Sequence, residues 1–303
     1  MEIFVILGPV FLLIGLGAGL QRAQFFGSSF LGDANRLTYW VGLPALIFLN
    51  LAKADYGTVA GSRLMVTLLL ATFLCVVLGA LTSRALGVKP EGMGTWTQAA
   101  FRGNLVFVGL PLILTMPGVP VAAAIVALAP LLVVYNGFSI GLLLFSQHRG
   151  SAGMGLMVLG GIVRNPIIIA SAAGGVAHFL KFSLWLPADR SLELVSRMAV
   201  PLALMCIGGS LVATPIREGR GIALLAAVFK TIASPLIGYA VGRISGLDAG
   251  EMRVVLVLMA CPTAAASYTM VRELGGDENI AAGAIVLSTL LSMGSLAVIL
   301  TAI

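Results

Sequence analysis

The feature that most constrains this chain is an internal repeat. Three pairs of identical residues are separated by the same 157 positions: Pro9 and Pro166, Pro44 and Pro201, and Arg63 and Arg220. Each half of the chain holds five apolar runs. Because five is odd, the second copy must enter a membrane in the orientation opposite to that of the first. Inverted repeats of this kind are typical of membrane transporters.

Composition places the chain in a membrane. Hydrophobic residues make up 59% of it, charged residues 10%, and the mean hydropathy is +1.06, which is outside the range of soluble domains. Spans of about 20 residues each use most of the chain and leave no room for a soluble catalytic domain. The 18 Lys and Arg residues are scattered between apolar runs, so the net charge of +6 does not indicate nucleic-acid binding.

We expect an all-α membrane protein with ten transmembrane helices in two inverted five-helix repeats. Residues 1–146 form the first repeat, 147–158 a short linker and 159–303 the second repeat. The expected spans are 3–20, 35–52, 63–86, 95–116, 120–145, 159–180, 192–213, 220–243, 251–272 and 279–302. The cations divide almost equally between the two sides of these spans, so the positive-inside rule does not predict the orientation.

Two prolines at equivalent repeat positions predict a functional site. Pro111 lies in the expected fourth span and Pro262 in the ninth. A proline removes a backbone donor and opens the helix, and in hydrocarbon a freed carbonyl survives only beside protein or a water-filled cavity. Paired broken helices are the best sequence indication of a transporter's substrate site, and their N-terminal ends favour anions. A simple kink is the alternative interpretation of each proline.

Three cations lie inside apolar runs, whereas all twelve Asp and Glu residues lie in or beside expected connections. Arg164 is close to a span end and is expected to snorkel to the interface. Arg102 either lines an entrance or snorkels. Lys230 lies near the middle of the eighth span with no acidic partner, so it either faces a substrate cavity or pairs with backbone carbonyls at a helix break.

Other polar side chains could contact a substrate: Thr115, Tyr135, Asn136, Thr263, Ser267 and Tyr268. Thr263 is the strongest of these because it directly follows the expected break. Ser and Thr commonly bond back to their own helix, which is the alternative for each of them. The two His residues lie near span ends and the three Cys residues are isolated, so we expect no metal site and no enzyme activity.

Four strings resemble the auxin efflux carrier family, which includes the plant PIN proteins and bacterial carriers labelled malonate transporters. The string from Asn104 to Leu112, NLVFVGLPL, resembles the family motif N-x-x-x-x-G-x-P-L. The others are Arg164-Asn165-Pro166, the segment from Pro201 to Leu211, and Cys261-Pro262-Thr263-Ala264. The resemblance covers essentially the whole chain.

This resemblance implies a fold similar to that of the bile-acid sodium symporters. Helices 1, 2, 6 and 7 would form a scaffold that can pair into a homodimer. Helices 3–5 and 8–10 would form a transport domain in which broken helices 4 and 9 cross. The implied function is secondary transport of small organic anions, mono- or dicarboxylates such as malonate, across the cell membrane by an elevator type of alternating access. The resemblance also places both termini on the non-cytoplasmic side and Asn104 against the substrate carboxylate.

The coupling of transport is left open by the sequence. Passive exchange, H⁺ symport and Na⁺ symport all fit, and the carbonyls of Phe107 and Leu258, which the prolines would free, could hold Na⁺. No other cofactor is expected. A sodium-coupled organic anion symporter is therefore one alternative, and a channel or sensor built from the same helices is the other.

Overall fold

The computed structural model describes residues 2–27, 29–53, 61–147, 160, 163–164, 166–182, 184–213 and 220–302. The described chain is helical apart from short connections. It divides into two compact units, and each unit takes one stretch from each half of the sequence. Unit 1 is Met1–Val59 with Val163–Pro215, and unit 2 is Ala60–Ile162 with Ile216–Ile303.

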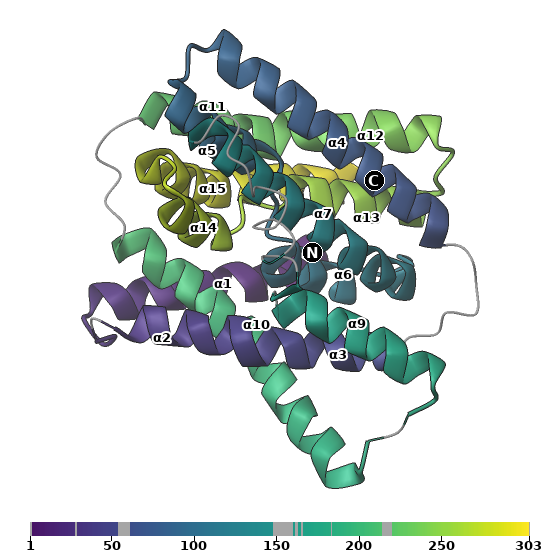
Figure 1. Ribbon diagram of the computed structural model, residues 1–303. Helices are drawn as coiled ribbons and strands as arrows, with labels where there is room; N and C mark the ends of the chain where they lie inside the picture. Colours follow the sequence, from purple (N-terminus) through teal and green to yellow (C-terminus); the bar gives the residue numbers. More distant parts are fainter. Residues whose placement is uncertain are drawn as a thin grey trace. The chain divides into compact units, whose positions relative to one another are not determined.

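Unit 1 contains α1 (Glu2–Arg22), α2 (Phe30–Leu37), the π-helical turn η1 (Thr38–Gly42), α3 (Leu43–Ala52), α9 (Pro166–Phe179) and α10 (Leu186–Ala213) (Figure 1). α1 packs along α10, and α3 packs on α9 and α10. Two glycines let α1 and α10 approach closely. A Cβ atom on Gly17 would overlap the carbonyl of Met205, and one on Gly208 would overlap that of Ile14. Small residues at such contacts are how helices pack in a membrane.

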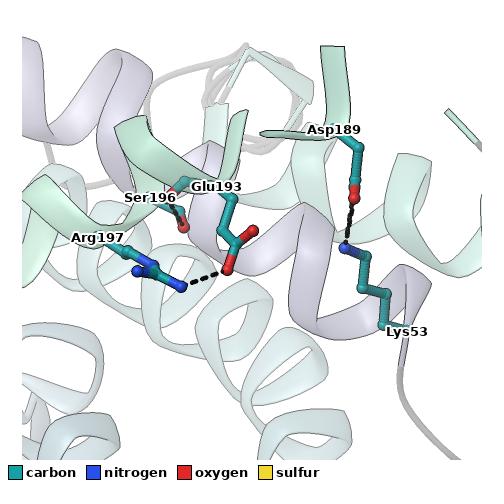
Figure 2. A network of polar contacts seen from close by, with 5 residues as sticks. All are labelled: Lys53, Asp189, Glu193, Ser196 and Arg197. Carbon is teal, nitrogen blue, oxygen red and sulfur yellow. Dashed lines mark hydrogen bonds and ion pairs between the residues drawn. The ribbon is translucent and has the colours of Figure 1, made fainter. Parts of the chain in front are cut away.

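Figure 2 shows two ion pairs among the described residues of unit 1, and their side chains are partly or largely exposed. Lys53, just after α3, places its ammonium 2.9 Å from the carboxylate of Asp189 in the first turn of α10. One turn further along α10, Glu193 lies 2.7 Å from Arg197, and the Glu193 carbonyl accepts a hydrogen bond from the Ser196 hydroxyl. Exposed pairs of this kind contribute on the order of 0–1 kcal/mol each.

Unit 2 contains α4 (Gly61–Ala85), α5 (Pro90–Phe101), the π-helical turn η2 (Leu105–Gly109), α6 (Leu110–Thr115), α7 (Val121–Gln147), α11 (Arg220–Val228), the π-helical turn η3 (Phe229–Ala233), α12 (Ser234–Ile244), α13 (Ala249–Ala260), α14 (Ala266–Leu274) and α15 (Glu278–Ala302). α4, α5 and α7 pack on one another, α11 packs on α15, and α12 packs on α13 and α4. The fully buried Trp96 donates its indole N–H to the Ile222 carbonyl at 3.0 Å and so joins α5 to α11.

The observed helices confirm an all-helical protein with several apolar helices. Four helices among the described residues are long and apolar enough to cross a membrane without interruption: Arg63–Ala85, Ala123–Gln147, Gly221–Ile244 and Glu278–Ala302. Two shorter apolar helices are Leu105–Thr115 and Ile168–Phe179. The full set of ten spans and their inverted arrangement stay a prediction. The expected linker lies almost entirely outside the described residues.

Three prolines each follow a π-helical turn instead of breaking a helix. Pro44, Pro111 and Pro235 are each the second residue of the α-helix that starts after η1, η2 or η3. In each case the preceding N–H bonds to the carbonyl five residues back: Leu43 to Thr38, Leu110 to Leu105 and Ser234 to Phe229. A proline ring in an α-turn meets the carbonyl four residues earlier. The wider π-turn provides room for it, so the helix continues through Pro111.

The glycine contact between α1 and α10 generates a test. Gly17→Ala should destabilise the protein by about 1–3 kcal/mol, because the added methyl group has a backbone carbonyl in its place and not a flexible side chain. Gly15→Ala is the matched control, since its Cβ would meet nothing within 4 Å on the same helix. Thermal melting of the two purified variants in detergent checks this. Equal melting midpoints would contradict the proposed close contact.

Candidate functional site

Two helices of unit 2 are interrupted by short non-helical stretches. α5 ends at Phe101 and η2 begins at Leu105, while α13 ends at Ala260 and α14 begins at Ala266. The second interruption contains Pro262, as the sequence predicts. The first precedes Pro111 and has no proline, so the expected break at Pro111 is wrong in position.

The two interruptions cross as a short antiparallel bridge. Gly103 pairs with Thr263 at its centre. The Asn104 N–H donates to the Pro262 carbonyl at 2.7 Å, and the Ala264 N–H donates to the Arg102 carbonyl at 2.9 Å. Each interrupted helix therefore satisfies backbone groups of the other, as buried non-helical chain in a membrane requires. We call this pairing of residues 102–104 with 262–264 the crossing.

Thr263 is held in the crossing by both its side chain and its backbone. Its hydroxyl donates to the carbonyl of Ala99 at 2.8 Å, in the last turn of α5. Its N–H donates to the hydroxyl of Ser288 on α15 at 2.9 Å. The Thr263 hydroxyl thus donates to a carbonyl at the end of α5, that of Ala99, whose helical donor the interruption removes. In the structure, Thr263 stabilises the crossing, and its contact with substrate stays a prediction.

Gly103 allows the chains at the crossing to approach. A Cβ atom there would lie 3.2 Å from Cε of Lys230 and 3.3 Å from the carbonyl oxygen of Leu258. Both contacts are tighter than ordinary van der Waals distance, so a larger residue at position 103 would require Lys230 and the Leu258 carbonyl to shift. Two residues from the second half of the sequence, Lys230 and Thr263, therefore lie against the interruption at residues 102–104.

Arg102 is buried, with 7% of its surface exposed, and its guanidinium turns to α7. One terminal nitrogen donates to the Ser139 hydroxyl at 2.9 Å and to the Tyr135 carbonyl at 3.3 Å. The other donates to the Asn136 side-chain oxygen at 2.8 Å. These three acceptors are neutral. Arg102 therefore brings a positive charge into the protein interior and connects the crossing to Asn136.

Lys230 is fully buried in the π-helical turn η3. Its ammonium donates to the Met259 carbonyl at 2.5 Å and to the Ser234 hydroxyl at 3.3 Å. No carboxylate of the described chain lies within ion-pair distance of it. The contact with Met259 matches one interpretation offered by the sequence, pairing with a backbone carbonyl at a helix break, and a role toward substrate stays a prediction. Arg164, by contrast, is exposed, as expected for a residue near a span end.

The remaining predicted residues are distributed around the crossing. Asn104 is the N-terminal cap residue of η2, is 4% exposed and makes no side-chain cap hydrogen bond. Ser267 lies in the first turn of α14, and its buried hydroxyl has no hydrogen-bond partner. Pro262 is buried in the crossing. Pro111 lies further along in α6 and takes no part in it.

Sequence reasoning did not single out four polar residues near the crossing: Gln98, Ser139, Ser234 and Ser288. The hydroxyls of Ser139, Ser234 and Ser288 accept from Arg102, Lys230 and Thr263. A serine inside an apolar run is an unspecific signal because it commonly bonds its own helix. Gln98 is completely buried with an unpartnered side-chain oxygen. Its position one turn before Arg102 is the signal that could have identified it.

A cavity of about 460 Å³ lies elsewhere in unit 2, between α12, α13 and α15. Its lining is mainly apolar and includes Pro235, Leu236 and Val298. It offers few polar groups to a charged ligand, so we place the candidate site at the crossing.

The bond between Ser288 and Thr263 can be tested by mutation. Ser288→Ala should lower stability by about 1–3 kcal/mol, because it leaves the buried Thr263 N–H without an acceptor. Ser292→Ala is the control on the same helix: its buried hydroxyl donates within α15, to the Thr289 carbonyl. Thermal melting compares the two. A control variant as unstable as Ser288→Ala would show that the crossing does not depend on this bond.

Several known proteins are similar to this chain over most of its length. A family model described as "Membrane transport protein" matches twice, over residues 3–154 and 151–300. A protein named "Putative malonate transporter" from Rhizobium meliloti (strain 1021) is 25% identical over 97% of this chain and 93% of its own. An "Uncharacterized transporter" from Methanothermobacter thermautotrophicus is 27% identical over 95% of this chain and 94% of its own. An uncharacterized transporter from Methanocaldococcus jannaschii is 25% identical over 86% of this chain and 85% of its own. The chain therefore belongs to the membrane transport protein family of auxin efflux carriers and is a multi-pass membrane transporter, not an enzyme.

Proposed function

We propose that this chain is a secondary transporter of small organic anions, mono- or dicarboxylates of the malonate type, that binds them at the crossing. The observation that carries the proposal is the pair of buried cations, Arg102 and Lys230, beside a polar crossing of two interrupted helices. Buried charge in a membrane is expensive and marks substrate pathways. A cationic interior favours an anionic cargo.

The groups around Arg102 suit a carboxylate. Its planar fork can hold a carboxylate through two parallel hydrogen bonds, and its present acceptors on α7 are neutral groups that an anion can displace or share. The Asn104 side chain makes no cap bond and the Ser267 hydroxyl is unpartnered, so both can donate to the same anion. Neither η2 nor α14 has a side-chain cap, which leaves N–H groups at two helix starts.

Movement of the site between the two sides is the second part of the proposal. The crossing residues are almost completely buried here, so an anion can enter only after the protein changes conformation. We assign unit 2 as the moving transport domain and unit 1 as the scaffold. Two copies of the chain pair through their scaffolds into a dimer, and both termini lie outside the cell. The division of the chain into two units, each drawn from both halves, supports this elevator type of alternating access.

Counterflow in proteoliposomes tests the function. Vesicles loaded with unlabelled malonate should accumulate labelled malonate from outside without any ion gradient, and competing mono- and dicarboxylates should rank the substrate class. A channel would equilibrate the label without transient accumulation. A monodisperse protein that produces no accumulation with malonate, shorter and longer dicarboxylates or aromatic acids would contradict the carrier proposal.

Arg102 should set the affinity for the anion. Arg102→Gln should reduce the exchange rate at low malonate roughly ten- to a hundredfold, because hydrogen bonds to a charged group contribute about 1.5–3 kcal/mol. Arg102→Lys should be intermediate, since it keeps the charge and loses the fork. Initial exchange rates over a range of malonate concentrations measure this, with the exposed Arg243→Gln as the control. Equal rates for Arg102→Gln and the control would remove Arg102 from the site.

A further inference from the structure

The end of α13 has carbonyl groups whose usual helical donors are missing or engaged elsewhere. In an α-helix, the carbonyl of Leu258 would accept from residue 262 and that of Met259 from residue 263. Residue 262 is proline and has no N–H. The N–H of Thr263 donates instead to the hydroxyl of Ser288. Neither carbonyl therefore has its helical partner.

The carbonyl of Ala260 is in the same position. Its helical donor would be the N–H of Ala264, which the crossing uses for the Arg102 carbonyl. Three consecutive carbonyls at the end of α13 thus lack their helical donors, inside a protein region where these residues are at most 1% exposed. They also carry the negative end of the helix dipole. This end of α13 is electrostatically a site for a cation.

The Lys230 ammonium occupies that position. It bonds the middle one of the three carbonyls, that of Met259, at 2.5 Å, and Ser234 provides a second oxygen at 3.3 Å. Its stem lies against Gly103, so the same side chain touches the other interrupted helix. Within the described chain, no group of His, Cys, Asp or Glu side chains could hold a metal ion. The positive charge at this helix end comes from the protein itself.

We propose that Lys230 is a tethered cation that takes the place of a bound ion at the crossing, so that transport does not require Na⁺. Unwound carbonyls and half-helix ends coordinate Na⁺ or H⁺ in transporters with broken helices. An ammonium already in contact with the Met259 carbonyl excludes a metal ion from it. Lys230 is covalently attached, so its charge stays beside the end of α13 at any ion concentration, whereas a free ion would bind and leave. The transport part of this inference rests on the proposed anion carrier; the ion-site part does not.

Chemical rescue tests whether the charge or only the bulk of Lys230 matters. Lys230→Ala removes the side chain beyond Cβ and leaves space for propylammonium, whereas Lys230→Met fills the space with a neutral chain. Both variants should lose about tenfold or more in malonate exchange and should melt earlier than the wild type. Propylammonium should raise the melting midpoint and the exchange rate of Lys230→Ala severalfold toward wild type. It should do neither for Lys230→Met or the wild type, and propanol should have no effect.

The wild-type protein supplies an independent measurement. Its melting midpoint and its exchange rate should be equal in Na⁺ and in choline at the same ionic strength. A Na⁺-dependent rise in either quantity overturns the proposal, as does a fully stable and active Lys230→Met or an equal rescue of Lys230→Ala by propanol. If Lys230→Ala cannot be purified folded, Lys230→Met and the wild-type comparison decide the question.

The two proposals fail in different ways. If the wild type exchanges no carboxylate but propylammonium still raises the midpoint of Lys230→Ala, the substrate assignment is wrong and the tethered cation stands. If malonate exchange is robust but depends on Na⁺, the carrier stands and Lys230 does not replace the ion.

Discussion

The structure of unit 2 depends on how two interrupted helices satisfy each other's backbone. Inside a membrane no water is available to open N–H and carbonyl groups, and each one left without a partner costs several kcal/mol. Asn104 donates to the Pro262 carbonyl and Ala264 to that of Arg102, so each interruption supplies what the other lacks. Thr263 adds bonds to Ala99 and Ser288, and Lys230 bonds the Met259 carbonyl at the end of α13. Because neither interruption could survive alone, the halves of the chain must fold against each other.

The cations Lys53 and Arg197 of unit 1 and Lys230 of unit 2 have different kinds of partner. In unit 1, Lys53 and Arg197 meet carboxylates at the exposed surface (Figure 2). In unit 2, Lys230 is buried and held by a helix-end carbonyl and a hydroxyl. A carboxylate beside Lys230 would neutralise it and remove the attraction for an anion. Helix-end carbonyls stabilise the ammonium with partial charges only, which leaves the interior positive overall.

Much of the helical framework could be predicted from the sequence, and part of the site. Apolar runs bounded by turn residues placed the helices, and Pro262 placed the second interruption, because a missing N–H acts locally. Pro111 misled the prediction for the first, since a π-helical turn accommodated its ring. Gly103 and Asn104 are weak helix formers, but no proline marks that interruption. It exists because the chain there pairs with residues 262–264, which are distant in the sequence.

The sequence by itself determined that this is a helical membrane transporter, because hydropathy and the repeat depend only on the order of residues. It also identified Arg102 and Lys230 as cations inside apolar runs, and Lys230 as the one near the middle of a span without an acidic partner. Only the tertiary structure decided their partners: α7 for Arg102 and the end of α13 for Lys230. The reason is that helix-end carbonyls become acceptors only where the other helix takes their donors. That exchange occurs between residues far apart in the chain.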